Sequence, residues 1–334
     1  MRRVRLLALF CALILLLSTV SCQRTELHTS RVYAMGTYCS LTEALSKGED
    51  GDSSPLFVSL LGECEALLSH RLDGSVPNLL NTLGYASVTD ERLLDALRLA
   101  EELRIKTDGR FSVLLLPLTD LWNFDAQSPV PPTEEALNAA LAKVADSTVS
   151  FCDGTVRAQG VDLGAIGKGY ACDVVADALC AKGKSALVSV GGSLAAIGAK
   201  PSGKPWQIGV RDPFSASANT TLGTLSLTDA FVSTSGSYEK CFTYEGVTYH
   251  HILDPKTGKP LDSDLVSVTV IAETGVLSDM LSTACFSVGS DGAFALASEY
   301  GASILAVKTD GTLLVSASLK GVFTPNAGWE ASYR

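Results

Sequence analysis

The sequence has no closely spaced cysteine pair and no excess of basic charge. Its nine cysteines include no C-x-x-C spacing, which argues against a zinc cluster and against a regular disulfide framework. We expect most of these cysteines to be small buried hydrophobic residues. The formal net charge of −10 is unfavourable for contact with a nucleic-acid backbone. We therefore expect no nucleic-acid partner.

Three familiar catalytic or nucleotide-binding signatures are also missing from the sequence. A P-loop would need glycine in place of Asp162 and Ser or Thr in place of Gly169. The glycines at 164, 167 and 169 have the reverse of the G-x-G-x-x-G spacing. The stretch Gly191–Ala195 has alanine where a G-x-S-x-G nucleophile turn needs its last glycine. These signatures are therefore excluded, and any nucleotide must be held in another way.

The first 22 residues have the three-part layout of a secretory signal. Three arginines precede the apolar run Leu6–Leu17, which is too short for a comfortable membrane span, and small residues follow. Cys22 directly after Ser21 resembles a bacterial lipobox, although Thr19 stands where leucine is usual. We expect lipid on Cys22 and an extracytoplasmic protein anchored to the bacterial cell membrane; a soluble secreted protein and an uncleaved anchor are the alternatives. The expected division is a signal peptide over 1–21, a lipid-anchored tether over 22–30 and a folded domain over 31–334, and removal of the signal takes the net charge from −10 to −13.

Apolar periodicity predicts helices mainly early in the chain and strands mainly late. Met35–Thr37 interrupts a strand predicted over 31–41, and loops are predicted before Asn81 and around Pro117. Because strands and helices do not alternate regularly, we expect an α+β fold with mixed or antiparallel sheets and helices packed on them. Helices are predicted over 55–68, 90–106, 133–144, 276–288 and 292–299, and the strongest strand over 265–272.

The stretch Asp162–Asp173 combines a glycine-rich turn with a lysine at the start of a helix. An apolar run ends at Val161, three glycines follow, and helical spacing of apolar residues begins at Ala171, which predicts strand, turn and helix. Glycines let a backbone approach a ligand closely, and a helix N-terminus offers free N–H groups to an anion. Lys168 adds a mobile cation suited to phosphate. The pattern indicates either a phosphate-binding turn or an ordinary helix start.

Two other stretches carry residues with suitable chemistry. Asp279 and Thr283 lie four residues apart on a predicted helix, so their oxygens face the same side. A carboxylate and a hydroxyl suit Mg²⁺ or Ca²⁺ better than zinc, and so few ligands suit Mg²⁺, which keeps waters and takes phosphate oxygens. His251 lies near the end of a strand predicted over 247–253 and precedes the turn Asp254–Gly258, and an imidazole can accept a proton at neutral pH. A solvated aspartate and a structural histidine are the alternatives.

Taken together, several stretches resemble the FAD:protein FMN transferase (ApbE) family over roughly residues 31 to 320. Family blocks in the right order are far more specific than any single block, and the sequence is identified as a member of this family. The blocks are Met35–Thr37, Ser75–Asn81, Asp108–Gly109 with Phe111, Leu121–Trp122, Asp162–Tyr170, Val190–Gly192, Val232–Tyr238, His251–Gly258 and Ser278–Thr283.

The resemblance implies a magnesium-dependent enzyme that splits the diphosphate of FAD, attaches FMN to a Thr or Ser hydroxyl of a partner protein and releases AMP. It implies that His251 is the base that activates the acceptor hydroxyl and that Asp279 is catalytic through Mg²⁺. The residues implied in magnesium binding are Ala165, through its carbonyl, with Asp279, Ser282 and Thr283. The residues implied in FAD contact are Met35, Arg71, Asn81, Arg110, Phe111, Ser112, Asp162, Lys168 and Leu253.

The sequence departs from the family pattern at two positions of flavin contact. Ser112 stands where aspartate is frequent, and Arg71 stands where an aromatic residue often follows the first helix. The chain also lacks the Asp-Gly-x-Ser/Thr-Gly acceptor pattern, so we expect it to modify another protein that carries this motif, a subunit of a membrane redox complex. The alternatives are an FAD pyrophosphatase that produces FMN and AMP, and a non-catalytic lipoprotein that binds FAD.

Overall fold

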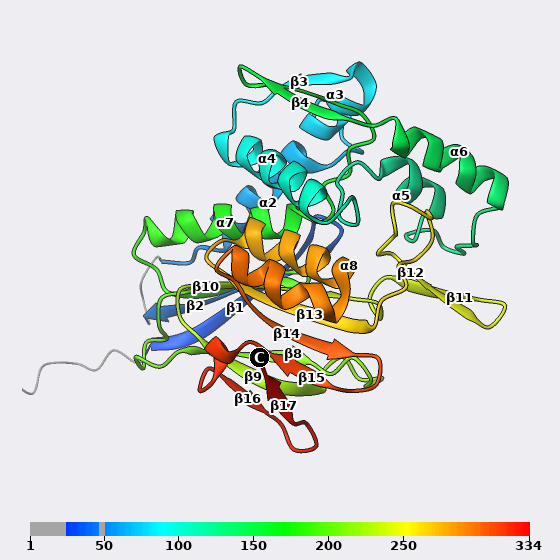
Figure 1. Ribbon diagram of the computed structural model, residues 1–334. Coiled ribbons are helices and arrows are strands. Elements are labelled where there is room, and N and C mark those ends of the chain that lie inside the picture. Colours follow the sequence, from blue (N-terminus) through cyan, green and yellow to red (C-terminus); the bar gives the residue numbers. More distant parts are fainter. Residues whose placement is uncertain (1–24, 47–50) are drawn as a thin grey trace, which may run out of the picture.

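The computed structural model describes residues 25–46 and 51–334, and it begins with a hairpin (Figure 1). The hairpin turns at Met35 and Gly36, whose φ angles of 52° and 69° lie in the left-handed region. The interrupted strand predicted over 31–41 is therefore two strands. Residues 25–30 of the predicted tether pair along this hairpin, and residues 1–24, with the predicted signal peptide and Cys22, lie outside the described residues. The strands are β1 (Thr25–Ala34) and β2 (Thr37–Ser46).

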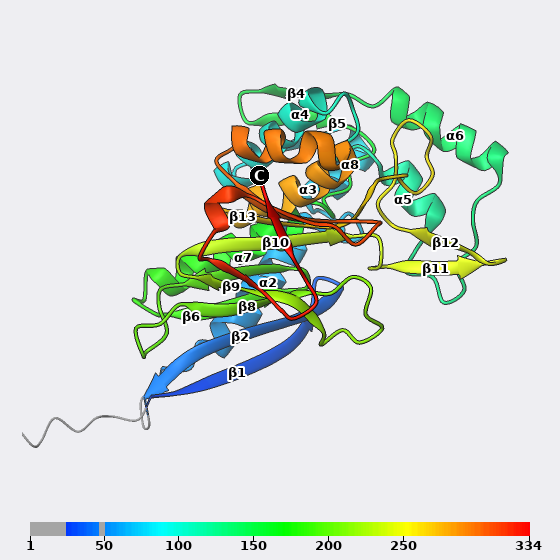
Figure 2. The ribbon, with the colours of Figure 1, turned by 60° about the horizontal axis from the view of Figure 1, so that its bottom comes forward.

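A nine-stranded sheet forms the middle layer of the described chain, with the β1–β2 hairpin at one edge (Figure 2). Its order is β1-β2-β6-β7-β10-β13-β14-β15-β17, and β15–β17 is the parallel pair in an otherwise antiparallel sheet. Alternate residues of β14 face opposite sides: Ala306 points to one apolar core and Val307 to another. The remaining strands are β6 (Ala186–Val190), β7 (Ser193–Ile197), β10 (Ala230–Gly236), β13 (Leu265–Ala272), β14 (Ser303–Lys308), β15 (Leu313–Val315) and β17 (Ala331–Tyr333).

Helices cover one face of this sheet and enclose the main core (Figure 1). Gly289, with a φ of 73°, breaks the last helix, which accounts for the two helices predicted over 276–288 and 292–299. This helix is long and apolar enough to cross a membrane by length and composition alone, but 61% of its most apolar window is buried inside the protein. The covering helices are α2 (Ser54–Leu68), α7 (Gly167–Cys180) and α8 (Gly275–Glu299).

A smaller sheet packs on the opposite face and closes a second apolar core. Trp206 and Leu225 from this sheet meet Val307 and Val315 of the large sheet in that core. The elements are β8 (Trp206–Arg211), β9 (Thr221–Leu227) and β16 (Phe323–Pro325), with the short helix η1 (Ala317–Leu319) before β16.

A third group of elements lies beyond the helical layer (Figure 1). The segment containing Asn81 is a helix rather than the predicted loop. Side chains of Asp90 and Thr133 cap the helices predicted over 90–106 and 133–144. These helices and mixed sheets confirm the α+β prediction. The group contains α3 (Val76–Leu83), β3 (Tyr85–Ser87), α4 (Glu91–Lys106), β4 (Val149–Cys152) and β5 (Thr155–Ala158).

The last group, which we call the arm, joins two helices to a separate hairpin at one side of the molecule (Figure 1). The loop predicted around Pro117 is one of these helices. An aromatic cluster holds the arm together, with the Trp122 ring 5.5 Å from those of Phe124 and Tyr249. The arm consists of α5 (Leu116–Trp122), α6 (Glu134–Ala145), β11 (Cys241–Tyr244) and β12 (Val247–His250).

The seven cysteines within the described residues are free. Four of the seven are buried, which confirms the expectation that most are, and Cys152, Cys180 and Cys241 are exposed. Burial raises the pKa of the Cys172 thiol well above its ordinary value, so this thiol stays protonated at neutral pH.

Candidate active site

Helices α7 and α8 cross at two glycines, and this crossing carries the polar residues of the candidate site. A Cβ atom on Gly169 would lie 2.7 Å from the Cβ of Asp279 and even closer to the Gly275 carbonyl oxygen. A Cβ on Gly275 would collide with the Gly169 carbonyl oxygen. The backbones can touch only because both residues are glycine. The predicted turn and helix are present, but the strand before them ends at Ala158 rather than at Val161.

A carboxylate from α7 holds the start of α8. Asp173 accepts hydrogen bonds from the Gly275 N–H at 2.6 Å and from the Val276 N–H at 2.9 Å. The Thr274 hydroxyl accepts a further bond from the Leu277 N–H at 3.2 Å. The first N–H groups of a helix have no partner within the helix, so these bonds fix its N-terminus. The first turns of α8 are therefore held at a set position relative to α7.

Asp279 is 4% exposed, and its carboxylate faces the first turn of α7. Its Oδ2 accepts a hydrogen bond from the Gly169 N–H at 2.9 Å. Gly169 lies in the first turn of α7, where a backbone N–H has no partner within the helix, and the carboxylate supplies that partner. Asp279 Oδ1 lies 3.6 Å from Lys168 Nζ, which also donates to the Gly164 carbonyl at 3.1 Å. The structure thus brings Asp279 and Lys168 together at the first turn of α7, and a role of the Ala165 carbonyl stays a prediction.

The oxygen groups around Asp279 suit magnesium. The Ser282 hydroxyl donates to the Asp279 carbonyl at 2.8 Å, and Thr283 lies one turn further along the same helix. Within the described residues, no group of three or more His, Cys, Asp or Glu side chains could hold a metal. A metal here would therefore take one carboxylate and neutral oxygens. That donor set fits Mg²⁺, which keeps waters and takes phosphate oxygens, and does not fit zinc.

A row of buried hydroxyls joins α8 to β10. The Ser233 hydroxyl lies 2.8 Å from that of Ser278. The Ser235 hydroxyl lies 2.7 Å from that of Ser282 and 3.0 Å from that of Thr283. These bonds satisfy buried polar groups and set the rotation of α8 on the sheet, which turns Asp279 toward α7. The alternating serines of the strand are a signal for such a row, but their partners lie more than 40 residues away in sequence.

His251 approaches the same site from the arm. Burial, and then the charges of Lys168 and Lys240, lower the pKa of His251 to about 4. The imidazole is therefore neutral at pH 7 and can accept a proton. Its Nδ1 is buried without a hydrogen-bond partner in the part of the chain that the structure describes. The effect of Lys168 on this pKa places the two side chains in one electrostatic environment.

The turn after His251 is anchored to the arm. Asp254 organises the turn, because its Oδ1 accepts from the Lys256 N–H at 2.8 Å and its carbonyl accepts from the Gly258 N–H at 2.7 Å. Trp122 Nε1 donates to the Gly258 carbonyl at 2.7 Å. Gly258 has a φ of 69°, and a Cβ there would press on leucines of α5 and α6. The arm therefore holds the segment that carries His251.

Met35 and Asp162, which are both predicted to contact FAD, lie beside the glycine turn. Met35 is at the tip of the β1–β2 hairpin, and its terminal methyl group lies 3.7 Å from the position of a Cβ on Gly167. Asp162 Oδ1 accepts from the Gly164 N–H at 2.9 Å. Both side chains are thus placed at the start of α7, close to Lys168.

Asn81, Phe111 and Ser112 support the segment that leads to Asp162. The Asn81 side chain donates to the Val161 carbonyl at 2.9 Å and accepts from the Val161 N–H at 2.7 Å. Phe111 is 1% exposed, and the Ser112 hydroxyl accepts from a nearby backbone N–H at 3.0 Å. These contacts hold the backbone in place. Direct contact of the three residues with FAD stays a prediction.

Three other residues predicted to contact FAD make contacts within the chain. The Arg71 side chain is 65% exposed and lies 3.5 Å from an Asp125 carboxylate oxygen. Leu253 packs in the apolar cluster of the arm. Exposed Arg110 donates to the Ser287 carbonyl at 3.4 Å. Contact of these three residues with FAD stays a prediction.

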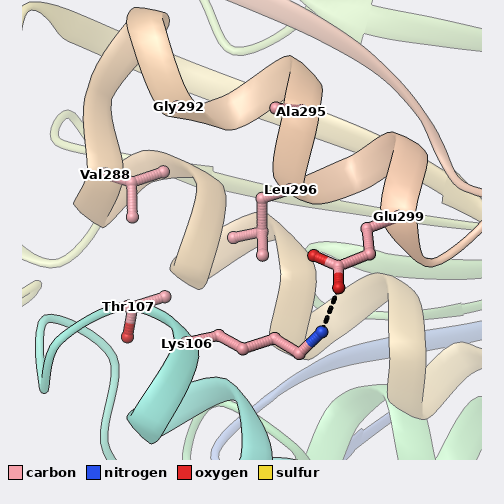
Figure 3. Close-up of a pocket in the computed structure, with 7 residues that line it drawn as sticks. All are labelled: Lys106, Thr107, Val288, Gly292, Ala295, Leu296 and Glu299. Carbon is pink, nitrogen blue, oxygen red and sulfur yellow. Dashed lines mark hydrogen bonds and ion pairs between the residues drawn. The ribbon is translucent and has the colours of Figure 1, made fainter.

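A cavity of about 310 Å³ lies between the end of α4 and the second half of α8 (Figure 3). An ion pair between Lys106 and Glu299 crosses it, and Val288 and Leu296 contribute apolar surface. None of the predicted site residues lines this cavity. Its charged groups neutralise each other, so we do not place the chemistry there.

Comparisons with known proteins place this geometry in context. The model of the ApbE family matches residues 35–306. The chain is similar to an FAD:protein FMN transferase of Treponema pallidum, with 33% identity over 287 residues that cover 78% of each chain. It is similar in structure to the flavin transferase ApbE from Vibrio cholerae, with a TM-score of 0.77, 28% identity, and coverage of 89% of this chain and 99% of that one. The ApbE protein of Thermotoga maritima matches with a TM-score of 0.78, 29% identity and the same coverage.

Proposed function

Because the chain belongs to the ApbE family, as its sequence predicts, we propose that it is a magnesium-dependent FAD:protein FMN transferase. Its substrates are FAD and a Thr or Ser hydroxyl of a partner protein, and its products are the FMN-modified protein and AMP. One observation carries the proposal: the Asp279 carboxylate and the Lys168 ammonium meet at the N-terminus of α7. A helix N-terminus and a lysine favour a diphosphate, and a carboxylate favours the divalent cation that accompanies it.

The reaction exchanges one P–O bond for another. The acceptor hydroxyl oxygen forms a bond to the FMN phosphorus, and the bond between this phosphorus and the bridging oxygen breaks. AMP leaves with the bridging oxygen, and the hydroxyl proton passes to His251, which is neutral at pH 7. Lys168 places a cation beside the diphosphate and offsets the negative charge that repels an incoming oxygen.

The site also has groups that would hold magnesium. Asp279, the Ala165 carbonyl and Thr283 would be the ligands, and the Ser282 hydroxyl, bonded to the Asp279 carbonyl, would support them. When bound, Mg²⁺ supplies Lewis-acid polarisation of the phosphoryl oxygens and stabilises the leaving phosphate. The Gly169 N–H orients the carboxylate, and the close α7–α8 crossing fixes its distance from Lys168.

We also propose where the enzyme acts and which kind of protein it modifies. Lipid on Cys22 would anchor the enzyme outside the cytoplasm, and the acceptor would be a membrane redox subunit with an Asp-Gly-x-Ser/Thr-Gly motif. The sequence supports this through its signal-like N-terminus and its lack of that motif in its own chain. Strand β1 begins three residues after Cys22, so the folded part would lie close to the membrane.

A peptide assay tests the transferase directly. The full-length protein is incubated with FAD, MgCl₂ and a peptide containing Asp-Gly-Ala-Thr-Gly, with a peptide carrying alanine in place of the threonine as control. We expect the threonine peptide alone to gain the mass of FMN, and EDTA to prevent this. Release of free FMN and AMP without peptide modification would indicate a pyrophosphatase. Tight FAD binding without turnover would indicate a binding lipoprotein.

A further inference from the structure

Lys168 lies near two acidic residues. One is Asp279, which belongs to the proposed metal site. The second is Glu239, which follows β10. A Cβ on Gly191 would lie 3.2 Å from Lys168 Cδ, and a Cβ on Gly192 would lie 4.0 Å from Glu239 Oε2. The lysine stem and the glutamate carboxylate therefore lie against neighbouring residues of the same β6–β7 turn.

The charges around Glu239 point to the same arrangement. Burial raises the pKa of Glu239, and the positive charges of Lys168 and Arg211 act against this rise. Arg211 lies over the Tyr238 ring, 4.7 Å from its centre. Lys168 makes its ion pair with Asp279, at 3.6 Å, and not with Glu239. Glu239 is thus a partly buried carboxylate within range of the charge of Lys168, whose ammonium group is paired with Asp279.

A metal bound at Asp279 would weaken the ion pair between Asp279 and Lys168. The Lys168 ammonium lies 3.6 Å from an oxygen of the Asp279 carboxylate, and two cations bound to one carboxylate repel each other. Lysine has a flexible four-carbon stem, so its ammonium group can move while its backbone stays in α7. Because Gly191 has no side chain, the lysine stem can lie against the β6–β7 turn, and Glu239 lies near the next residue of that turn, Gly192.

We propose that Glu239 is a positioning residue that takes over the Lys168 ammonium when a divalent cation occupies Asp279. Lys168 then stays beside the diphosphate instead of competing with the metal for the carboxylate. This inference rests on the proposed function and deepens it, because it assigns a role to a residue outside the predicted metal and FAD sets. Glu239 acts through Lys168 and touches neither substrate nor metal.

Titration calorimetry with MgCl₂ and no FAD tests the idea on the full-length protein. We expect Glu239→Gln to weaken magnesium binding about tenfold, within the range of coupling between residues in one charge network, because Lys168 stays on Asp279. In a Lys168→Met background the competitor is gone, so adding Glu239→Gln should change Kd by less than about twofold. Glu245→Gln, an exposed glutamate on the β11–β12 turn, is the matched control and should leave Kd unchanged.

Three results would overturn the inference: an unchanged Kd in Glu239→Gln, an equal loss in both backgrounds, or magnesium-bound crystals in which Lys168 stays on Asp279. The expected crystal shows Lys168 Nζ within about 3.2 Å of a Glu239 oxygen. If Glu239→Gln does not fold, Glu239→Asp replaces it and should show an intermediate Kd. Magnesium binding and FMN transfer by the wild type, with no effect of Glu239→Gln, would reject this inference and leave the proposed function intact. A wild type that does not bind magnesium would reject both.

Discussion

Gly169→Ala is the sharpest perturbation of the α7–α8 crossing. The new methyl carbon would lie 2.7 Å from Asp279 Cβ, about 1 Å short of a normal carbon–carbon contact. The Gly275 carbonyl oxygen would be closer still, and backbone cannot rotate away as a side chain can. The helices must therefore separate, and the bond from the Gly169 N–H to Asp279 lengthens with them.

The cost should appear in both stability and rate. Overpacking of a close contact costs about 1–3 kcal/mol of the free energy of unfolding. A displacement of a catalytic carboxylate by about 1 Å commonly costs about 10²-fold in rate. We therefore expect Gly169→Ala to lower Tm, to weaken magnesium binding, and to slow FMN transfer about a hundredfold.

Gly62→Ala provides a matched control for the same chemical change. Gly62 lies inside α2, and a Cβ there meets no atom within 4 Å. Alanine is the better helix former, so this variant should be neutral or stabilised by about 0.5–1 kcal/mol, with normal transfer. Thermal unfolding, calorimetry and the peptide assay compare the two variants. Wild-type stability and transfer in Gly169→Ala, or equal losses in both variants, would refute the role of the crossing.

The remaining predictions concern Asp279, His251 and Trp122. Asp279→Asn should abolish magnesium-dependent turnover and calorimetric magnesium binding, and full turnover in this variant would remove the carboxylate from the site. The folded-state pKa of His251 is about 4 and its ordinary value is 6.5, so the unfolded chain takes up the proton first on acidification. The free energy of unfolding should fall by about 3 kcal/mol between pH 6.5 and 4 from this group, and urea titrations should show this slope flattened in His251→Gln. Trp122→Phe leaves the buried Gly258 carbonyl without its hydrogen-bond donor, at a cost of about 1–3 kcal/mol in the free energy of unfolding. The variant should lower kcat for transfer and leave the FAD Kd, measured by flavin fluorescence, nearly unchanged. A change in FAD Kd alone would contradict the prediction.

Local sequence signals predict the elements whose boundaries depend on local interactions. Asp90 and Thr133 stand just before amphipathic runs, and each caps its helix as a side-chain acceptor. The strand predicted over 265–272 has those bounds in the structure, because its β-branched residues suit a sheet that is buried on both faces. In each case the deciding interaction lies within a few residues of the element itself.

Helices α3 and α5 escape prediction from the sequence for one shared reason. Pro77 and Pro117 suggest loops, but each lies in the first turn of a helix, where proline lacks only an N–H that would be unpaired in any case. Ser75 before Pro77 is an N-cap, and its hydroxyl accepts from the Asn78 N–H at 3.1 Å. The capping signal is present in the sequence, but the general association of proline with loops outweighs it.

The sequence predicts site residues that are close together in the chain, but not the contacts between distant segments that hold them in place. Apolar periodicity predicts one helix for Asp279 and Thr283, and their four-residue spacing predicts that they share a face of it. Both residues lie on α8. The hydrogen bond between the Ser233 and Ser278 hydroxyls depends on the packing of α8 on β10, and no local sequence pattern predicts that packing. Glu239 escapes prediction in the same way, because its proximity to Lys168 depends on the β6–β7 turn that both approach.

The metal side and the acceptor side of the proposed site have different local supports. Asp279 is held by the α7–α8 crossing, whereas the turn after His251 is held by the arm, through Leu253 and the bond from Trp122 to Gly258. Damage to the crossing should therefore impair magnesium binding and transfer together, since the carboxylate is needed for both. Damage at Trp122 should impair transfer while magnesium binding persists, because the hydrogen bond to Gly258 does not reach α8. A loss of magnesium affinity in Trp122→Phe would show that the two supports are coupled, and the separation of metal binding from proton acceptance would then have to be abandoned.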